Sequence, residues 1–586
     1  MTCSEEIIFW RSFSCSPPLA VSASALGQSG ELLIALPEPV DEIQNQAHLP
    51  DLAGARAGTW QVLFDLDQLR FPSQLQGSSA VIEVERFMEE AHLPGTLWMG
   101  LPGHSRMVEL DIREIHQLSD NILSYHGHID GEHAYAATIT VNMATDHVLA
   151  RLHHGSRLYL IDDHVADQMA HVHVIDKPRL PVFECVAGSE EVRSPRRAHS
   201  VQGDSGVTLL SSQDNGNVRA LFYYTPEVAS ANNIDLMIDN IVAEMNATVY
   251  ESGVDPKNYI SAAGRIQTGN NNFNSSSYCG CCPIGDRFNN DLLDKLIQAE
   301  GMFSQIASEM DAVYADIAVL VVSDECDRLG GAIHHSHDMS DPAPFAVVTD
   351  EFAMADLTAL HEIGHLLGSG HEETAENTPD PIPEAPGNAR GFLEPAPWND
   401  DKAEWQTMMG GYQTKPDPDN PDDPEYPECQ FDWSFPDPPD PSNQSCVRLP
   451  MWSNPNKSYA GKPTGDVNKA FNGQALNTTF PQVAGWGLSY PHAAPQSPSN
   501  LSVQPGYCYG LNGLSWSSPS HAEYYQVFVD KSHTQNWERV YHGSGTSVWL
   551  SVPQSDLSWS ARVRACNGTG CGAYSDPVTV FYYDGC

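Results

Sequence analysis

One stretch of the chain carries histidines at a spacing that suits a metal ion. Within residues 355–371, ADLTALHEIGHLLGSGH, His361 and His365 stand four residues apart, and Glu362 directly follows the first of them. Leucine and isoleucine recur here at helical spacing, which predicts a helix. Residues four apart share one helical face, so both imidazoles can bind the same ion.

The residues that follow complete the expected site. Gly368 can adopt a positive φ and end the helix, and His371 then returns as a third nitrogen ligand. Three neutral imidazoles leave one tetrahedral position for water, which distinguishes a catalytic zinc site from a closed structural one. Glu362 is expected to accept a proton from the zinc-bound water, whose pKa the ion lowers to about 7, and to protonate the leaving group. A helix with surface histidines is the alternative, and it requires all the fixed positions of HExxHxxGxxH to have arisen by chance.

The segments before the histidines predict an α/β domain. Residues 218–225, VRALFYYT, and 315–326, ADIAVLVVSDEC, are apolar runs typical of buried strands. Residues 292–310 predict a helix, and an earlier helix is marked by Ile234, Met237, Ile241 and Met245. Alternating strands and helices are typical of α/β folds. Residues 344–352, PFAVVTDEF, are predicted to form an edge strand on which an extended peptide could pair.

The first 200 residues divide into two segments. Residues 1–28 are expected to be a leader or a disordered N-terminus; acids stand where a signal peptide carries positive charge, so no signal peptide is visible and the true start is open. Residues 29–200 predict a mainly β domain. Three arginines mark a polar segment, 189–203, which is predicted to be a protease-sensitive junction after a propeptide. An ordinary linker is the alternative.

Two further segments follow the histidines. Residues 414–444 are rich in proline and aspartate, a composition expected to prevent helices and strand ladders. An acidic loop closed by Cys429 and Cys446 is one interpretation; a Ca²⁺ site is the other, although the spacing matches no EF-hand. From 497 to 586, short alternating strands separated by turn-forming residues predict a β-sandwich.

Charge and cysteine content narrow the classes of function. The 586 residues include 76 Asp and Glu against 30 Lys and Arg, a formal charge of −46, which disfavours nucleic acid and anionic membranes as partners. No run approaches the ~18–20 apolar residues of an integral membrane segment. Of 13 cysteines, the middle and last regions hold even numbers, which suits disulfides and predicts a secreted, extracellular protein. The cluster from Cys279 to Cys282 could instead hold structural zinc, but no second CxxC pair completes the ligands.

These motifs together resemble the metzincin clan of zinc peptidases. HExxHxxGxxH is followed by QTMMGGY at 406–412, which is similar to the clan's methionine turn; Met409 fits its Thr-x-Met pattern and Met408 is the runner-up. Tyr412 falls three residues after Met409 instead of two, and the resemblance implies that it stabilises the transition state. Within the clan the chain looks most like bacterial reprolysin-like enzymes, although Glu372 stands where aspartate is usual.

The resemblance implies an α/β (α+β) metzincin-type catalytic domain over residues 215–490. A mainly β N-terminal propeptide would precede this domain, and a C-terminal β-sandwich would follow it. The resemblance further implies one catalytic Zn²⁺ and protein or peptide substrates. Some metzincin propeptides silence the enzyme by placing a cysteine on zinc, and Cys185, just before the junction, is the candidate for that latency; a buried free cysteine is the alternative.

The remaining features leave a second functional interpretation open. Residues 497–586 resemble a fibronectin type III module in Trp516 and in the stretch VRACNGTGCGAYSDP, with Trp559 where a corner tyrosine is usual. The chain could be an adhesin or binding protein in which this module binds a cell-surface or carbohydrate ligand and the peptidase domain is inactive. The intact histidines and glutamate argue against inactivity. A second metal site could be built from His334, His335 and His337, but a polar loop is the preferred interpretation.

Overall fold

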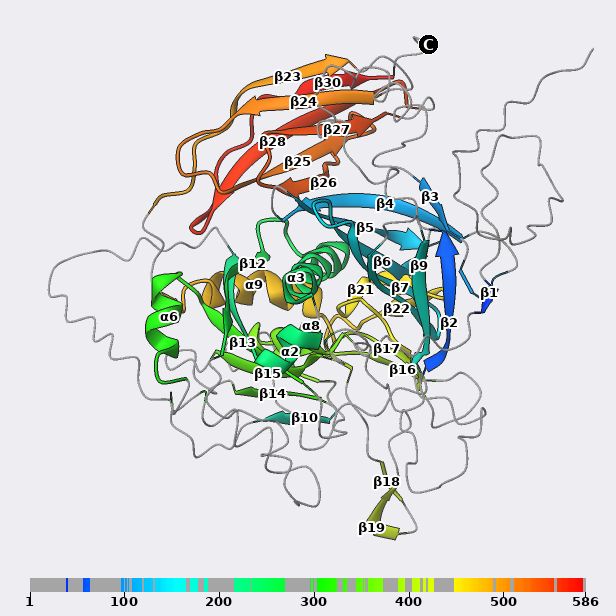
Figure 1. The fold of residues 1–586 in the computed structure, drawn as a ribbon. Coiled ribbons are helices and arrows are strands. Elements are labelled where there is room, and N and C mark those ends of the chain that lie inside the picture. The colour runs from blue at the N-terminus through cyan, green and yellow to red at the C-terminus, as the bar shows by residue number, and fades with distance from the viewer. Residues whose placement is uncertain are drawn as a thin grey trace, which may run out of the picture.

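The computed structural model describes residues 96–177, 216–268, 303–323, 344–371, 388–410, 447–505 and 511–582, with short gaps in several ranges, and a few strands and single residues outside them. The structure is mixed and strand-rich, with few helices (Figure 1). We call its parts the N-terminal domain (38–177), the central domain (184–487) and the C-terminal module (499–582). Within these described ranges, no helix is long and apolar enough to cross a membrane.

The central domain is built on a six-stranded sheet of order β10-β14-β15-β13-β11-β12. Its strands are β10 (Glu184–Ala187), β11 (Asn217–Tyr224), β12 (Tyr259–Gln267), β13 (Ile317–Val322), β14 (Gly330–His334) and β15 (Phe345–Thr349). β12, β11, β13 and β15 run parallel, and β14 is antiparallel to β15. The apolar runs predicted as buried strands form β11 and β13, in the interior of the sheet, as is typical of parallel strands.

The prediction that residues 344–352 form the edge strand is wrong. These residues contain β15, which pairs with β13 on one side and with β14 on the other. β14 has the sequence GGAIH, whose glycines give little local strand preference, and β10 pairs with its outer side. The pairing partners, which are distant in sequence, therefore decide which strand lies at the edge.

Helices cover both faces of this sheet (Figure 1). α3 (Ile234–Glu251), α8 (Thr358–Leu366) and α9 (Asn472–Val483) share a core with Phe222 and Val319. α6 (Ile306–Ala312) packs on the other face with Leu221 and Leu320, because successive strand residues point to opposite faces. α2 (Pro226–Ala231) follows β11. Of the helix predicted at 292–310, the structure describes Leu296, which is helical, and α6, which begins at Ile306.

The N-terminal domain is an antiparallel meander, shown in blue and cyan in Figure 1. Its strands are β1 (Glu38–Pro39), β2 (Arg56–Leu63), β3 (Thr96–Met99), β4 (Val108–Gln117), β5 (Ile122–Ile129), β6 (Glu132–Asn142), β7 (His147–His154), β8 (Arg157–His164) and β9 (Met169–Asp176). The side-chain amide of Asn240 in α3 donates to Oγ1 of Thr140 in β6 at 2.9 Å. Helix α3 therefore lies between this meander and the central sheet.

The chain after α8 forms one small three-stranded sheet and two strand pairs. Their strands are β16 (Leu393–Pro395), β17 (Ala403–Gln406), β18 (Lys415–Asp417), β19 (Asn420–Glu425), β20 (Val447–Arg448), β21 (Asn454–Tyr459) and β22 (Lys462–Thr464). The expectation that residues 414–444 form no strand ladder is wrong at β18 and β19, which pair antiparallel with Pro416 opposite Pro424. Both strands of an isolated pair are edges, where proline is tolerated because no inner ladder needs its missing N–H.

The C-terminal module contains the alternating strands that its sequence predicts. They are β23 (Ser499–Pro505), β24 (Leu511–Ser517), β25 (Tyr524–Asp530), β26 (Glu538–Gly543), β27 (Ser547–Ser551), β28 (Ser558–Asn567), β29 (Gly570–Cys571) and β30 (Val578–Phe581). A disulfide joins Cys566 to Cys571; Cys279, Cys282, Cys429 and Cys446 lie outside the described residues. β26 also pairs with β4, so one sheet runs through the N-terminal domain and the module.

Candidate metal centre

Helix α8 is positioned by its apolar side chains. Leu360, Ile363 and Leu366 are buried in the core that α8 shares with α3. The chain after the helix turns at Gly368, whose φ of 88° confirms the predicted left-handed conformation. Glycine adopts this φ without the steric cost that a Cβ would bring, so the chain can turn back toward the helix at this point.

The three predicted histidines meet at one point. The Nε2 atoms of His361 and His371 are 2.9 Å apart, and Nε2 of His365 lies 3.1 Å from each of them. Ligands of a tetrahedral zinc ion, with bonds of about 2.0–2.1 Å, are themselves about 3.3 Å apart, so this triangle fits one ion. Within the described part of the chain, it is the one group of three or more His, Cys, Asp or Glu side chains close enough to hold a metal.

Hydrogen bonds on the far sides of the rings decide which nitrogens face the centre. Nδ1 of His361 donates to the carbonyl oxygen of Met408, and Nδ1 of His365 donates to that of Ser369, both at 2.8 Å. A carbonyl oxygen only accepts, so these Nδ1 atoms carry the protons and the two Nε2 atoms present lone pairs to each other. Facing lone pairs repel, and a cation between them removes the repulsion. The donor set therefore fits a metal ion.

The surroundings also hold the rings in the neutral form that binds metal. Burial lowers the pKa of His361 well below its usual value, and His365 and Arg448 lower it further. Burial, with the charges of Arg448 and Arg390, lowers the pKa of His371 to about 3. At neutral pH these two rings carry no proton that would compete with an ion.

Glu362 lies fully buried in α8, directly after His361. One residue along a helix is a rotation of about 100°, so its side chain leaves the helix in a different direction from those of the two helical ligands. A carboxylate beside the ligand set, but outside it, is what a general base acting on bound water requires.

The predicted methionine turn packs against α8. Met408 and Met409 are fully buried. A Cβ on Gly364, between the two helical histidines, would lie 2.7 Å from Sδ of Met409 and 2.5 Å from Cη2 of Trp452. The close approach of sulfur and indole therefore requires glycine at this position. Tyr412 lies outside the described residues.

Two arginines near the histidines were missed in the sequence. Arg448, in β20, is buried, and its charge acts on both His361 and His371. Arg390 is half-buried, and its Nη1 donates to the carbonyl oxygen of His371 at 3.3 Å. The chain has only 30 Lys and Arg, so basic residues are uncommon in it, but nothing in the sequence placed these two arginines beside the histidines.

The candidate latency cysteine and the second histidine cluster lie outside residues 355–371. Cys185 lies in β10, opposite Gly331 of β14. His334 is the last residue of β14, where a polar loop was predicted. His335 and His337 lie outside the described residues.

Known proteins related to the chain are distant. It is 24% identical over 352 residues, 59% of this chain and 68% of the relative, to a peptidyl-Asp metalloendopeptidase of Stenotrophomonas maltophilia (strain K279a). Proteins of the same name are 25% identical in strain R551-3, of which the chain covers 55%, and 22% identical in Xanthomonas campestris pv. campestris, of which it covers 67%. The relatives support a metallopeptidase. No family model matches the chain.

Similar solved structures cover the chain only in part. A chaperone–substrate complex is 15% identical, with a TM-score of 0.29, over 47% of this chain and 35% of the other. A structure named FN3tt mut is 16% identical, with a TM-score of 0.13, over 15% of this chain and 92% of the other. TM-scores this low carry no argument about either part.

Proposed function

We propose that the chain is a secreted zinc endopeptidase of the metzincin type, made as a latent zymogen. The observation that carries the proposal is the triangle of buried Nε2 atoms, held by His361, His365 and His371, with Glu362 next to it on the same helix. The distant metalloendopeptidase relatives support the same class of reaction.

In this proposal the three histidines hold the ion and Glu362 moves the proton. When bound, zinc lowers the pKa of its water and polarises the scissile carbonyl. Glu362 accepts the proton of that water and delivers it to the amine that leaves. The carbonyls of Met408 and Ser369 orient the rings, as partners of metal-binding histidines do.

Three observations support the proposed metzincin type, the fibronectin-like module and export. Gly364 gives close packing of Met409 against the histidine helix, which is the place a methionine turn takes in the metzincin interpretation. The C-terminal module is proposed to be a fibronectin type III-like sandwich on its strand pattern. The Cys566–Cys571 disulfide supports export to an oxidising compartment.

Latency is proposed to depend on the segment that contains Cys185. This segment forms β10, which pairs in parallel with β14 at the outer side of the central sheet, where an extended peptide could pair. The thiol would then be the group that blocks the ion in the uncut chain. If unprocessed Cys185→Ala protein is as inactive as unprocessed wild type, the thiol has no part in latency.

The relatives' name, peptidyl-Asp metalloendopeptidase, suggests a preference for aspartate in the substrate. An aspartate side chain needs a cation, and Arg448 and Arg390 place two near the histidines in a strongly acidic chain. We propose that one of them recognises an aspartate of the substrate. Peptides that differ only in Asp or Asn at one position test this: Arg448→Met or Arg390→Met should abolish the preference for Asp, and a preference unchanged in both variants refutes it.

Hydrolysis of casein, with and without a chelator, tests the proposed activity. The wild type should lose activity with the chelator and recover it with zinc, and Glu362→Ala should be inactive while still binding zinc. Cleavage that is insensitive to the chelator, or undiminished in the variant, contradicts the mechanism. A wild type that binds zinc yet cleaves nothing favours the alternative of a binding protein with an inactive peptidase domain.

A further inference from the structure

The N-terminal domain is joined to the C-terminal module by a strand pairing (Figure 1). β26 runs parallel to β4, with Tyr541 opposite Ile115 and Gly543 opposite Gln117. A Cβ on Gly543 would lie 2.3 Å from Cβ of Gln117, so the two backbones approach closely. The hydroxyl of Tyr541 donates to Oε1 of Gln117 at 2.7 Å.

A buried ion pair lies beside this pairing. Arg539 of β26 contacts Glu114 of β4, and the two residues are 1% and 2% exposed. Burial alone would raise the pKa of Glu114, but Arg539 and His116 outweigh it and lower the pKa to about 2, so the carboxylate is charged at neutral pH. The pair is therefore a full ionic contact removed from water, and losing one partner would leave a buried charge without compensation.

Arg539 also contacts the central domain. Its backbone N–H donates to the hydroxyl of Tyr250 at 2.9 Å, and its guanidinium carbon lies 4.7 Å from the centre of that ring. Tyr250 belongs to α3, the helix between the two sheets. The ring of His542, in the same strand, lies 5.4 Å from that of Tyr259 in β12. One strand of the module thus contacts both other parts.

The N-terminal domain also contacts the central domain through a buried ion pair. Arg151 of β7 pairs with Glu244 of α3, and neither is exposed. Nη1 of Arg151 also donates to the carbonyl oxygen of Ala353 at 2.8 Å. Apolar residues of the meander enter the same core as α3; they include Ile122, Leu149, Leu158 and Leu160. Loss of the N-terminal domain would expose this core and Glu244 together.

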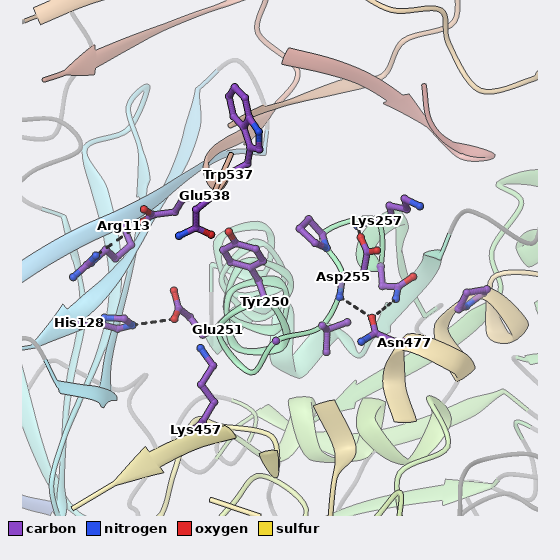
Figure 2. A pocket seen from close by; sticks show the side chains of 16 residues that line it. Arg113, His128, Tyr250, Glu251, Asp255, Lys257, Lys457, Asn477, Trp537 and Glu538 are labelled. Atoms are coloured by element: carbon purple, nitrogen blue, oxygen red, sulfur yellow. Dashed lines mark hydrogen bonds and ion pairs between the residues drawn. The ribbon is translucent and has the colours of Figure 1, made fainter. Parts of the chain in front are cut away.

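A cavity of about 820 Å³ marks the place where the three parts meet (Figure 2). Arg113 and His128 line it from the N-terminal domain, Tyr250 and Glu251 from α3, and Glu538 from the module. Two contacts cross it at longer range: Nε2 of His128 lies 3.5 Å from Oε2 of Glu251, and Nη1 of Arg113 lies 4.0 Å from Oε1 of Glu538. The side chains of Arg113 and Glu538 are 35% and 33% exposed, and an ion pair this near solvent contributes little. The buried Arg539–Glu114 contact, and not the Arg113–Glu538 pair on the cavity's rim, should therefore hold the junction.

We propose that the C-terminal module is an internal clamp that keeps the N-terminal domain on the central domain, so that the N-terminal domain stays bound after the chain is cut at 189–203. The partner of the module's β26 surface is therefore this chain's own N-terminal domain, on the sheet edge offered by β4. The inference does not depend on peptide hydrolysis, because its test measures which fragments remain together.

The test uses the full chain with residues 193–197 replaced by the recognition sequence of a specific protease. After cutting, gel filtration in native buffer should give one particle of the uncut mass, 64.1 kDa, that separates into two fragments only in denaturant. An N-terminal fragment that elutes alone in native buffer overturns the proposal.

Point variants then test the clamp itself. Glu114→Gln and Arg539→Met should each speed release of the N-terminal fragment on the order of a hundredfold, because each leaves the other residue of the pair buried without its charged partner. The double variant should release the N-terminal fragment more slowly than either single variant does. Glu538→Gln, on the cavity rim, is the matched control and should change release by less than about fivefold. Equal release from Glu538→Gln and Arg539→Met overturns the clamp.

A folding defect can be separated from a loss of docking. Each uncut variant is compared with uncut wild type by near-UV circular dichroism. If Arg539→Met fails to fold, Arg539→Lys replaces it, because the lysine keeps the charge but loses the two-pronged contact with Glu114. Arg539→Lys should fold and release the cut fragment faster than wild type, and release at the wild-type rate would overturn the clamp.

Discussion

The packing at Gly364 gives a sharp prediction for the metal site. In Gly364→Ala the new Cβ would lie 2.5 Å from Cη2 of Trp452 and 2.7 Å from Sδ of Met409. The indole cannot easily yield, because Trp452 is fully buried, its ring N–H donates to Oγ1 of Thr248 at 3.3 Å, and its backbone N–H donates to Oγ of Ser252 at 2.9 Å. The methionine, or the helix, must therefore move.

Gly364→Ala should have a small effect on the free energy of unfolding and a large effect on the affinity for zinc. Replacing glycine by alanine in a helix gains about 1 kcal/mol of intrinsic propensity, whereas overpacking a core costs about 1–3 kcal/mol. The net loss in the free energy of unfolding is thus only about 0–2 kcal/mol. Movement of Met409 also displaces the adjacent Met408 carbonyl, which orients His361, and loss of such a partner weakens metal binding about 10–100-fold.

Competition with a chromogenic chelator measures zinc affinity directly, and thermal melting of the chelated protein measures stability. Gly485→Ala is the matched control, since its Cβ would meet no atom closer than 3.3 Å; its zinc affinity should equal that of wild type. If Gly364→Ala binds zinc as tightly as wild type, the packing of Met409 and Trp452 against the helix does not support the metal site.

Three further predictions concern charge, acid and metal. Arg151→Met and Glu244→Gln should each lower the free energy of unfolding in urea by about 3–5 kcal/mol, because each leaves its buried partner without compensating charge. The double variant should lose less than either single variant, and a loss equal to the sum of the two single losses would contradict this. Docking of the N-terminal domain should weaken as pH falls from 6.5 to 4. Burial lowers the pKa of His126 and His153 to about 4, so rings that release exposes to solvent bind protons before docked rings do, an effect of about 3 kcal/mol for each ring at most. Fragment release that is independent of pH over this window would refute it. The charged or titratable groups around these two rings are Glu114, His116, His128, Arg151, Lys177, Glu244 and Glu251. Chelation should lower the melting temperature, and zinc should restore it, because an ion that binds only the folded chain stabilises it; identical melting curves would contradict a buried ion.

The parts of the site that could be predicted are those set by short-range spacing. His361 and His365 share a helical face whatever the rest of the fold does, and Gly368 allows the turn that returns His371. The apolar runs of β11 and β13 are similarly local. These features needed no knowledge of distant residues.

The parts that were missed depend on residues far apart in the chain. Arg539 and Glu114 are 425 positions apart, and each alone is typical of the solvent face of a strand. They are buried because each compensates the other. β14 was missed for a related reason: its glycine-rich sequence forms a strand only because β15 and β10 pair with it.

The zinc content of the purified chain shows whether His361, His365 and His371 bind one ion. We expect one zinc per wild-type chain after gel filtration, one in Glu362→Gln, and none in His371→Ala, because losing a ligand should weaken zinc binding by more than the 10–100-fold effect of losing an outer partner. A wild type that retains no zinc when zinc is supplied, or a His371→Ala variant that retains it as tightly as wild type, would contradict a site made by these three imidazoles.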